Sequence, residues 1–257
     1  EDFLNLRRNT GDERLRCHDM NTAAWIPDLF MQKVQNDEDW YMFCPSESRD
    51  LHEAFGDCFT AVYDQMIGKA EAGELKNFRK IKAKELWKKM LKVLFETSHP
   101  WITFKDPSNI RYSNQHEGTV HSSNLCTEIL LHTKPSVYKD GEKTIVGETA
   151  VCNLGSVNLK NHLIQNESGK FKLNRDLLAS TIKTAVRLLD NVVDLNFYPT
   201  KEAANSNLQH RPVGLGMMAT HDVLQLVDVQ YDSDEAVKYI DELTEFFSYN
   251  AILSSSE

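Results

Sequence analysis

One short segment places three chemically capable side chains at alternate positions. Asn124, Cys126 and Glu128 offer an amide, a thiol and a carboxylate. In extended backbone, residues two apart face the same side at a spacing of roughly 6–7 Å. The three groups would then line one surface about as wide as a small substrate. We expect an irregular backbone here, at a loop tip, although residues 125–129 also have the character of a strand.

A plainer interpretation of this segment stays open. It could be a strand with a buried thiol and two solvated polar groups. A second cysteine, Cys152, lies in the apolar, strand-like run 150–154. A cysteine in such a run is usually an inert core residue. Spacing alone therefore gives Cys152 no function.

Composition excludes several classes of protein. Lys and Arg number 29 against 38 Asp and Glu, a net charge of −9, which argues against an extended nucleic-acid footprint. No run approaches ~18 apolar residues, as a transmembrane helix needs, and no signal peptide is recognisable. The cysteines form no Cys-x-x-Cys pair, so we expect no metal site and free thiols in the cytoplasm. The five cysteines are Cys17, Cys44, Cys58, Cys126 and Cys152.

The elements that must position these side chains follow from hydrophobic periodicity. Apolar stripes predict helices over residues 86–95, 178–193 and 237–247, and weaker patterns suggest helices at 24–35 and 58–72. Asn174 and Ser233 are N-cap candidates, and Pro100 follows the first of these helices. Strand candidates are residues 40–43, 101–104, 125–129, 150–154 and 213–217. Helices and strands alternate, which predicts an α/β fold in a single domain.

The remaining stretches are expected to be loops or ends. Residues 105–118 and 138–148 are polar and are predicted to be loops. His210 and His221 are expected to be solvated rather than metal ligands. Residues 1–6 have the pattern of the middle of a secondary-structure element, and residues 249–253 are still helical in pattern. We therefore expect the chain to be a portion of a longer protein.

The segments 123–129 and 151–159 together resemble the catalytic large subunit of ribonucleotide reductase, of the aerobic, diiron-radical-dependent bacterial or phage type. Further matching stretches are residues 3–9, 20–22, 25–31, 99–106 and 211–216. The resemblance implies a ten-stranded α/β barrel with the radical cysteine on an inserted finger loop. Residues 1–257 would form a portion of that barrel, without its N-terminal allosteric region, its C-terminal end or its tail.

The same resemblance implies a role for each candidate residue. Cys126 would be the transient thiyl radical that abstracts the 3′ hydrogen of a ribose. Glu128 would take the 3′-hydroxyl proton, and Asn124 would bind the ribose hydroxyls. Ser123 would line the substrate site with these three. Cys152 would be one half of a redox-active dithiol whose partner cysteine lies outside this chain.

Implied cofactors and partners lie mostly outside the chain. The family reduces ribonucleoside diphosphates to deoxyribonucleotides, with a radical supplied by a diiron small subunit. Thioredoxin or glutaredoxin would re-reduce the enzyme, and nucleoside triphosphate effectors would bind regions that this chain lacks. We expect no cofactor or metal bound by the chain itself, and no turnover without complementary portions of the large subunit.

Two other functions stay open at this point. One is a portion of a cobalamin-dependent reductase of the same superfamily, which generates its radical on a bound cofactor. The other is a non-catalytic remnant that only binds partner polypeptides. A cut barrel would also expose strand edges and apolar faces, so we predict poor solubility for the isolated chain.

Overall fold

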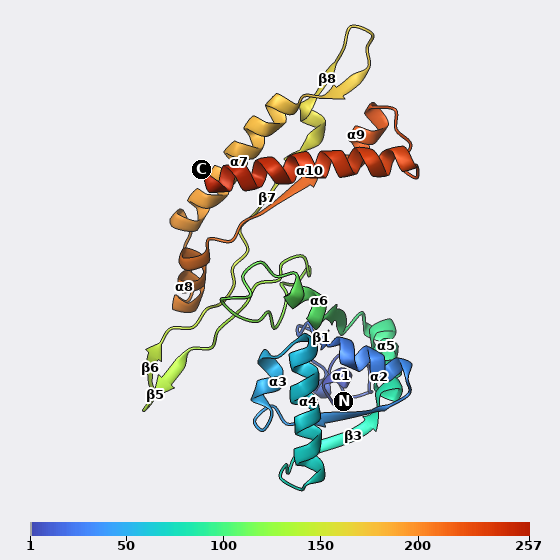
Figure 1. Cartoon of the computed structure of the whole chain (residues 1–257), viewed down its shortest axis with the longest axis vertical. Coiled ribbons are helices and arrows are strands. Elements are labelled where there is room, and N and C mark those ends of the chain that lie inside the picture. Colours follow the sequence, from blue (N-terminus) through green and yellow to red (C-terminus); the bar gives the residue numbers. More distant parts are fainter. Residues whose placement is uncertain (1) are drawn as a thin grey trace. The chain divides into compact units, whose positions relative to one another are not determined.

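The computed structural model describes residues 2–257, and contacts within the chain divide them into two compact units (Figure 1). Unit 1 ends at Lys134, and unit 2 runs from Pro135 to Glu257. Glu1, the first residue of the expected N-terminal element, lies outside the described residues.

Unit 1 alternates helices with short strands. Its helices are α1 (Asp2–Asn5), the 3-10 turn η1 (Glu13–Leu15), α2 (Asp28–Gln35), α3 (Arg49–Glu53), α4 (Gly56–Glu71), α5 (Ala83–Thr97) and α6 (Lys105–Ile110). Its strands are β1 (Ala23–Ile26), β2 (Asp39–Phe43), β3 (Phe78–Lys82) and β4 (Trp101–Phe104). Strands β1 and β4 pair in parallel, whereas β2 and β3 pair antiparallel.

Two apolar clusters stabilise unit 1. In the first, Ile26 of β1 and Phe30 of α2 pack against the buried face of α5. The second is centred on Tyr63 of α4, which is 1% exposed and stacks on Trp40 with ring centroids 4.4 Å apart. The Tyr63 hydroxyl accepts the N–H of Tyr41 at 2.6 Å, so the buried phenol is satisfied by strand β2.

A buried charged pair at the start of α6 ties the elements of unit 1 together. Asp106, 2% exposed, accepts the backbone N–H groups of Asp28 at 2.6 Å and of Gly56 at 2.8 Å. These N–H groups begin α2 and α4, and helix N-termini favour a carboxylate. Its neighbour Lys105 is 4% exposed and donates to the carbonyls of Leu51 and His52, both at 2.9 Å. Helix α6 therefore fastens α2, α3 and α4.

Unit 2 contains two antiparallel hairpins, one parallel strand pair and four α-helices within the residues described. Its strands are β5 (Val137–Lys139), β6 (Glu142–Ile145), β7 (Leu154–Asn158), β8 (Leu163–Gln165), β9 (Phe171–Leu173) and β10 (Gly214–Met218). Its helices are the 3-10 turn η2 (Leu159–His162), α7 (Arg175–Leu195), α8 (Lys201–His210), α9 (Thr220–Leu226) and α10 (Asp234–Ser256). Strands β7 and β10 pair in parallel.

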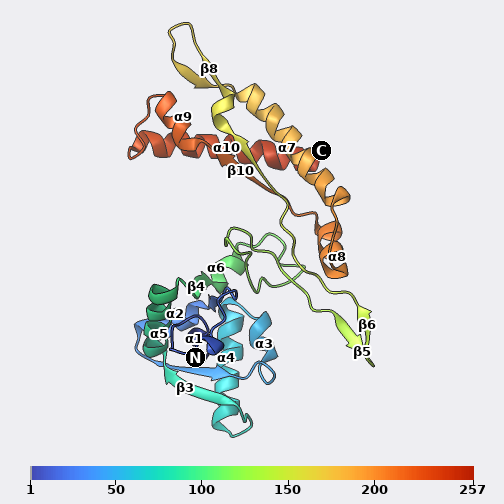
Figure 2. The ribbon, with the colours of Figure 1, turned by 180° about the vertical axis from the view of Figure 1, so that it is seen from behind.

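The core of unit 2 lies where α7 and α10 pack against each other and against β7 (Figures 1 and 2). The predicted stripe of α7 is buried at Leu178, Ile182, Val186, Leu189 and Val193. Asn174 caps α7, because its side chain accepts the N–H of Leu177, and Ser233 caps α10 in the same way. Both N-cap predictions are confirmed.

Several predicted boundaries were wrong for local reasons. Residues 24–35 are not one helix, because Pro27 separates β1 from α2. The expected loop 105–118 begins with α6. The expected loop 138–148 contains the β5–β6 hairpin, whose turn residues Asp140 and Gly141 have φ of 54° and 85°. Two positive φ values in a two-residue turn are typical of a type I′ hairpin, and Asp-Gly is its usual sequence.

Large apolar side chains are exposed in both units. Phe95 of α5 is 94% exposed, so the predicted stripe of this helix is buried only in part. Leu195 and Phe197, at the end of α7, are each 85% exposed. Within residues 2–257, the helices are too short or too polar to cross a membrane.

Candidate functional site

The segment that carries Cys126 is a tight loop, and the strand predicted for residues 125–129 was wrong. The backbone turns at Leu125 and Cys126, and Thr127 has a φ of 68°, in the left-handed region that strands avoid. Asn124 closes the loop. Its N–H donates to the carbonyl of Ile129 at 3.3 Å, and its side-chain Oδ1 accepts the N–H of Ile129 at 3.0 Å. The expectation of an irregular backbone is confirmed.

The loop leaves the reactive groups exposed at its tip. The side chains of Cys126 and Glu128 are both exposed, and the Cys126 thiol is free. Asn124 uses Oδ1 within the loop, while its Nδ2 has no hydrogen-bond partner in the part of the chain that the structure describes. Ser123 donates its hydroxyl to the carbonyl of Asn124 at 3.0 Å. An amide donor, a thiol and a carboxylate are thus presented together on a stretch of five residues.

The residues before the loop are anchored to α6 and to the end of α3. Val120 is fully buried, and its N–H donates to Oδ1 of Asn109 at 2.7 Å. The Asn109 amide donates back to the carbonyl of Val120 at 3.1 Å. Thr119 donates its hydroxyl to the carbonyl of Glu53 at 2.9 Å. The exposed loop therefore begins at a rigid, buried base.

A pocket of about 250 Å³ lies beside the loop. Trp25 of β1 and Trp101 of β4 contribute apolar walls, whereas His121, Ser123 and Asn124 contribute polar ones. Paired strands β1 and β4 therefore form one side of the pocket and the cysteine loop the other. A small polar ligand with an apolar face suits such a lining.

Burial lowers the pKa of two basic side chains near the base of the loop. Burial lowers the pKa of Lys105 to about 8, against attraction from Asp106 and Glu53. Burial also lowers the pKa of His121, and the nearby His52 acts in the same direction. Glu53 acts against that shift through a contact of 3.3 Å between its Oε2 and Nε2 of His121.

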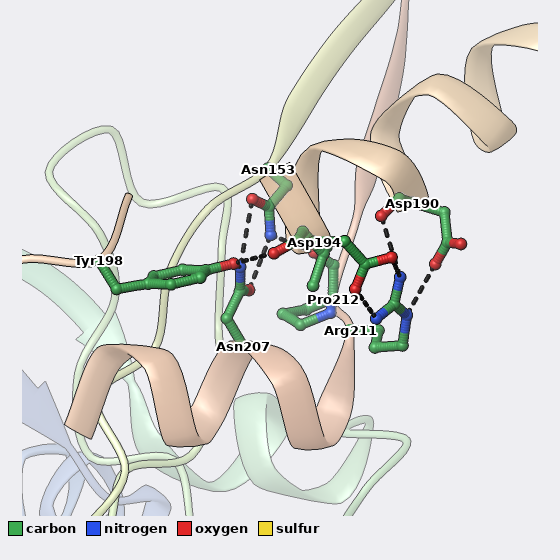
Figure 3. Close-up of polar contacts among 8 residues, drawn as sticks. Asn153, Asp190, Asp194, Tyr198, Asn207, Arg211 and Pro212 are labelled. Carbon is green, nitrogen blue, oxygen red and sulfur yellow. Dashed lines mark hydrogen bonds and ion pairs between the residues drawn. The ribbon is translucent and has the colours of Figure 1, made fainter. Parts of the chain in front are cut away.

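Cys152 lies in unit 2, directly before β7, and is exposed. The strand predicted for residues 150–154 was wrong, because β7 begins at Leu154. The residue after Cys152, Asn153, is 4% exposed, and its Nδ2 donates to Oδ1 of Asn207 and to the carbonyl of Pro212, both at 2.8 Å. A buried amide pair thus fixes the backbone beside the thiol (Figure 3).

Helix α8 completes this buried network. Asn207, fully buried, donates from Nδ2 to the hydroxyl of Tyr198, which itself donates to the carbonyl of Val193 at 2.6 Å. At the end of α8, Arg211 donates to Asp190 and, through two nitrogens, to Asp194 (Figure 3). Arg211 has a φ of 47°, so the ion pairs hold a left-handed turn that leads into β10. Hydrogen bonding to Arg211 lowers the pKa of Asp194.

The structure thus brings Ser123, Asn124, Cys126 and Glu128 into one loop, whereas Cys152 belongs to the other unit. One histidine prediction was wrong: the side chain of His210 is only 11% exposed and contacts the buried Glu148 at 2.6 Å.

The residues that support the site were not predicted from the sequence. Asn109, Lys105 and Asn207 had no signal in their spacing, since their partners are distant in sequence. Asn153 alone offered one, because it is a polar residue within an apolar run directly after a cysteine.

Comparison with known proteins identifies the family to which the chain belongs. The family model of the ribonucleotide reductase barrel domain matches residues 1–257. The ribonucleoside-diphosphate reductase subunit alpha of Chlamydia pneumoniae is 52% identical over 256 residues, which cover 100% of this chain and 23% of that protein. The large subunit of Caenorhabditis elegans is 37% identical over 256 residues, covering 100% of this chain and 30% of that protein.

A third relative shows the same pattern. Subunit alpha of Helicobacter pylori strain J99 is 36% identical over 300 aligned residues, covering 99% of this chain and 36% of that protein. The chain therefore spans well under half the length of these three relatives, as the expectation of a portion of a longer protein requires. Because the family model matches the whole chain, the chain belongs to the ribonucleotide reductase barrel-domain family.

Proposed function

We propose that this chain carries the radical-cysteine portion of a ribonucleoside-diphosphate reductase large subunit, with residues 1–257 forming part of one catalytic barrel domain. The observation that carries the proposal is the match of the barrel-domain family model along the whole chain, including the Cys126 loop. The relatives named as ribonucleoside-diphosphate reductases support the substrate class. The product would be a deoxyribonucleoside diphosphate for DNA synthesis.

Cys126 starts the reaction in this proposal. Its thiyl radical takes the 3′ hydrogen atom of the ribose, which regenerates the S–H bond and leaves a carbon radical on the sugar. The exposed thiol at the loop tip supports this role, because a substrate can reach it. Glu128 accepts the 3′-hydroxyl proton from the same loop, two residues away.

Asn124 and Ser123 bind the sugar. Oδ1 of Asn124 braces the loop, and its Nδ2 donor is available to a ribose hydroxyl. Ser123 and Asn124 both line the 250 Å³ pocket, which supports a role in substrate binding. The loop brace and the substrate contact would thus use opposite ends of one amide.

Cys152 supplies reducing equivalents together with a cysteine outside this chain. The 2′-hydroxyl leaves as water, the two thiols are oxidised to a disulfide, and the sugar is reduced by two electrons. Cys126 then returns the hydrogen atom to the 3′ carbon and becomes a radical again. Thioredoxin or glutaredoxin would reduce the disulfide for the next cycle.

The remaining machinery would come from other polypeptide regions. The name subunit alpha, borne by the Chlamydia relative, supports a separate partner subunit, which would supply the radical from its diiron centre. We assign no residue of this chain to that centre. Nucleoside triphosphate effectors would bind outside residues 1–257, and the assembled enzyme would act in the cytoplasm.

Two substitutions in the full-length enzyme test these roles. We expect Cys126→Ser to abolish both deoxyribonucleotide formation and release of tritium from a 3′-labelled substrate, because serine is a poor hydrogen-atom relay. Cys152→Ser should abolish formation of the deoxyribonucleotide and yet retain the release of tritium from the 3′-labelled substrate. The matched control is Cys58→Ser on α4, an exposed cysteine without an assigned role, which should retain turnover.

Turnover by Cys126→Ser would overturn the assignment of the radical residue. Activity that requires adenosylcobalamin and no second subunit would favour the cobalamin-dependent alternative. Inactivity of the wild-type enzyme with every partner present would favour a non-catalytic remnant.

A further inference from the structure

Three metal-ligating side chains meet at the base of the Cys126 loop, outside the residues assigned to the reaction. His52 and Glu53 end helix α3, and His121 directly precedes the loop. One ligand atom from each lies within 4.8 Å of the other two. The sequence separates His121 from the other two by more than sixty residues, so spacing gave no hint of this cluster.

The distances within the cluster suit a small divalent ion. Oε2 of Glu53 lies 3.3 Å from Nε2 of His121. Two ligands at about 2.0–2.1 Å from a tetrahedral zinc ion are separated by roughly 3.3–3.4 Å. The pair therefore already has the spacing of one edge of a tetrahedral site.

His52 lies close enough to supply the third ligand once its ring has turned. Its ring stacks on that of His121, with centroids 3.9 Å apart and planes inclined by 10°. Lone pairs of stacked imidazoles lie in parallel planes and cannot converge on one ion. Occupation therefore requires His52 to rotate out of the stack, which its exposed side chain permits.

The backbone at the cluster is held by hydrogen bonds, while the side chains of His52 and Glu53 are exposed. Lys105 donates to the carbonyl of His52, and Thr119 donates to the carbonyl of Glu53. Nδ1 of His121 is buried and has no hydrogen-bond partner among the described residues. Lys105 opposes a second cation, whereas the Glu53 carboxylate attracts one, so moderate affinity is expected.

We propose that His52, Glu53 and His121 form a binding site for a divalent transition-metal ion of the zinc type. Two imidazoles and one carboxylate are ligands that zinc and its neighbours prefer, and three protein ligands leave a fourth position for water. The ion would link α3 to the residue that precedes the Cys126 loop. Binding itself does not depend on the function proposed above.

Cobalt titration of the full-length, chelator-treated protein tests the site. We expect one equivalent of Co²⁺ to give visible d–d absorption without a thiolate charge-transfer band, and Zn²⁺ to displace it. His52→Asn and Glu53→Gln should each lower the affinity of the site for Co²⁺ by at least about tenfold, since even outer partners of metal ligands contribute about 10–100-fold to metal affinity. His121→Asn should do the same, and the two exposed positions keep the test valid if this third variant does not fold.

The control is His18→Asn. His18 lies 3.2 Å from Glu13, so it forms a similar histidine–glutamate contact but lies outside the cluster. The His18→Asn variant should bind the same one equivalent of Co²⁺, without a thiolate band, at the wild-type affinity. The proposal would be overturned if the wild type bound no such equivalent of Co²⁺. It would also be overturned if His52→Asn and Glu53→Gln bound Co²⁺ with the affinity of the wild type. Because absorption is read without turnover, failure of this site is distinguishable from failure of the reductase assignment.

Discussion

The segments of the two cysteines proposed to do chemistry are held in place differently. The Cys126 loop is exposed and is closed by bonds between Asn124 and Ile129, five residues apart. Cys152 is also exposed, but the adjacent Asn153 is buried and bonded to Asn207, more than fifty residues away. Local bonds close one cysteine segment, and long-range buried bonds fix the other.

This difference matches the two proposed tasks. A radical cysteine has to approach a substrate, so an exposed tip on a rigid base gives access without loss of position. A dithiol cysteine has to meet one partner thiol within the narrow geometry of a disulfide. A buried amide pair, which is costly to disrupt, suits the second task.

The largest expected effect is at the Cys152 side of the comparison. Asn207→Ala removes two side-chain partners of a buried network and leaves the Asn153 amide partly unsatisfied. We expect local opening to become easier by about 2–3 kcal/mol, or roughly 30- to 150-fold. Hydrogen exchange of the Gly214 N–H, which donates to the carbonyl of Asn153 at 2.9 Å, measures this opening in the full-length protein.

Asn191→Ala is the matched control for that experiment. Asn191 is an exposed asparagine on α7, and its loss should change exchange by no more than the usual surface effect of about 0.5 kcal/mol. Equal exchange in the Asn207 variant and its control would mean that the amide pair does not fix the Cys152 segment.

The sequence predicted the helices of this fold well because their signals are local. The stripe of α7 and its Asn174 cap lie within one stretch of chain, and both were confirmed. Strands were harder. Residues 125–129 look like a strand, but the Asn124 side chain competes for the backbone N–H that a strand neighbour would have used.

The site was predictable in part for the same reason. Asn124, Cys126 and Glu128 lie within five consecutive residues, so both pattern and family resemblance pointed to them. Their supports are not adjacent. Asn109 fastens the base of the loop from eleven residues away, and Lys105 fastens α3 from more than fifty. Such contacts arise only when distant segments pack, and no periodicity encodes them.

The second effect is pH-dependent and concerns the base of the Cys126 loop. Lys105→Met removes two hydrogen bonds to backbone carbonyls and also a buried charge, with a net cost of about 1–2 kcal/mol at pH 7. The pKa of Lys105 is about 8 in the folded protein and 10.5 when unperturbed. Between these values the unfolded chain binds more protons, so stability from this group rises with pH.

Unfolding followed by tryptophan fluorescence measures this change, because all four tryptophans of the chain belong to unit 1. The difference in the free energy of unfolding between wild type and Lys105→Met should be constant below pH 8. It should widen in favour of the wild type from pH 8 up to pH 10.5. Lys84→Met, at an exposed position of α5, is the control and should show no such slope. A flat difference across this range would mean that Lys105 titrates normally.

The smallest expected effect is at the loop itself. Asn124→Ala removes the side-chain acceptor of the Ile129 N–H. This N–H lies near the surface, so it can donate to water instead. We expect a cost of about 1 kcal/mol and hydrogen exchange at Ile129 faster by about fivefold. Ser122→Ala is the control, because it removes an exposed hydroxyl that, among residues 2–257, bonds only to the carbonyl of Ser123. An effect of Asn124→Ala on exchange as large as that of Asn207→Ala would contradict the contrast between the two cysteines, because it would mean that the exposed loop is stabilised as strongly as the buried network.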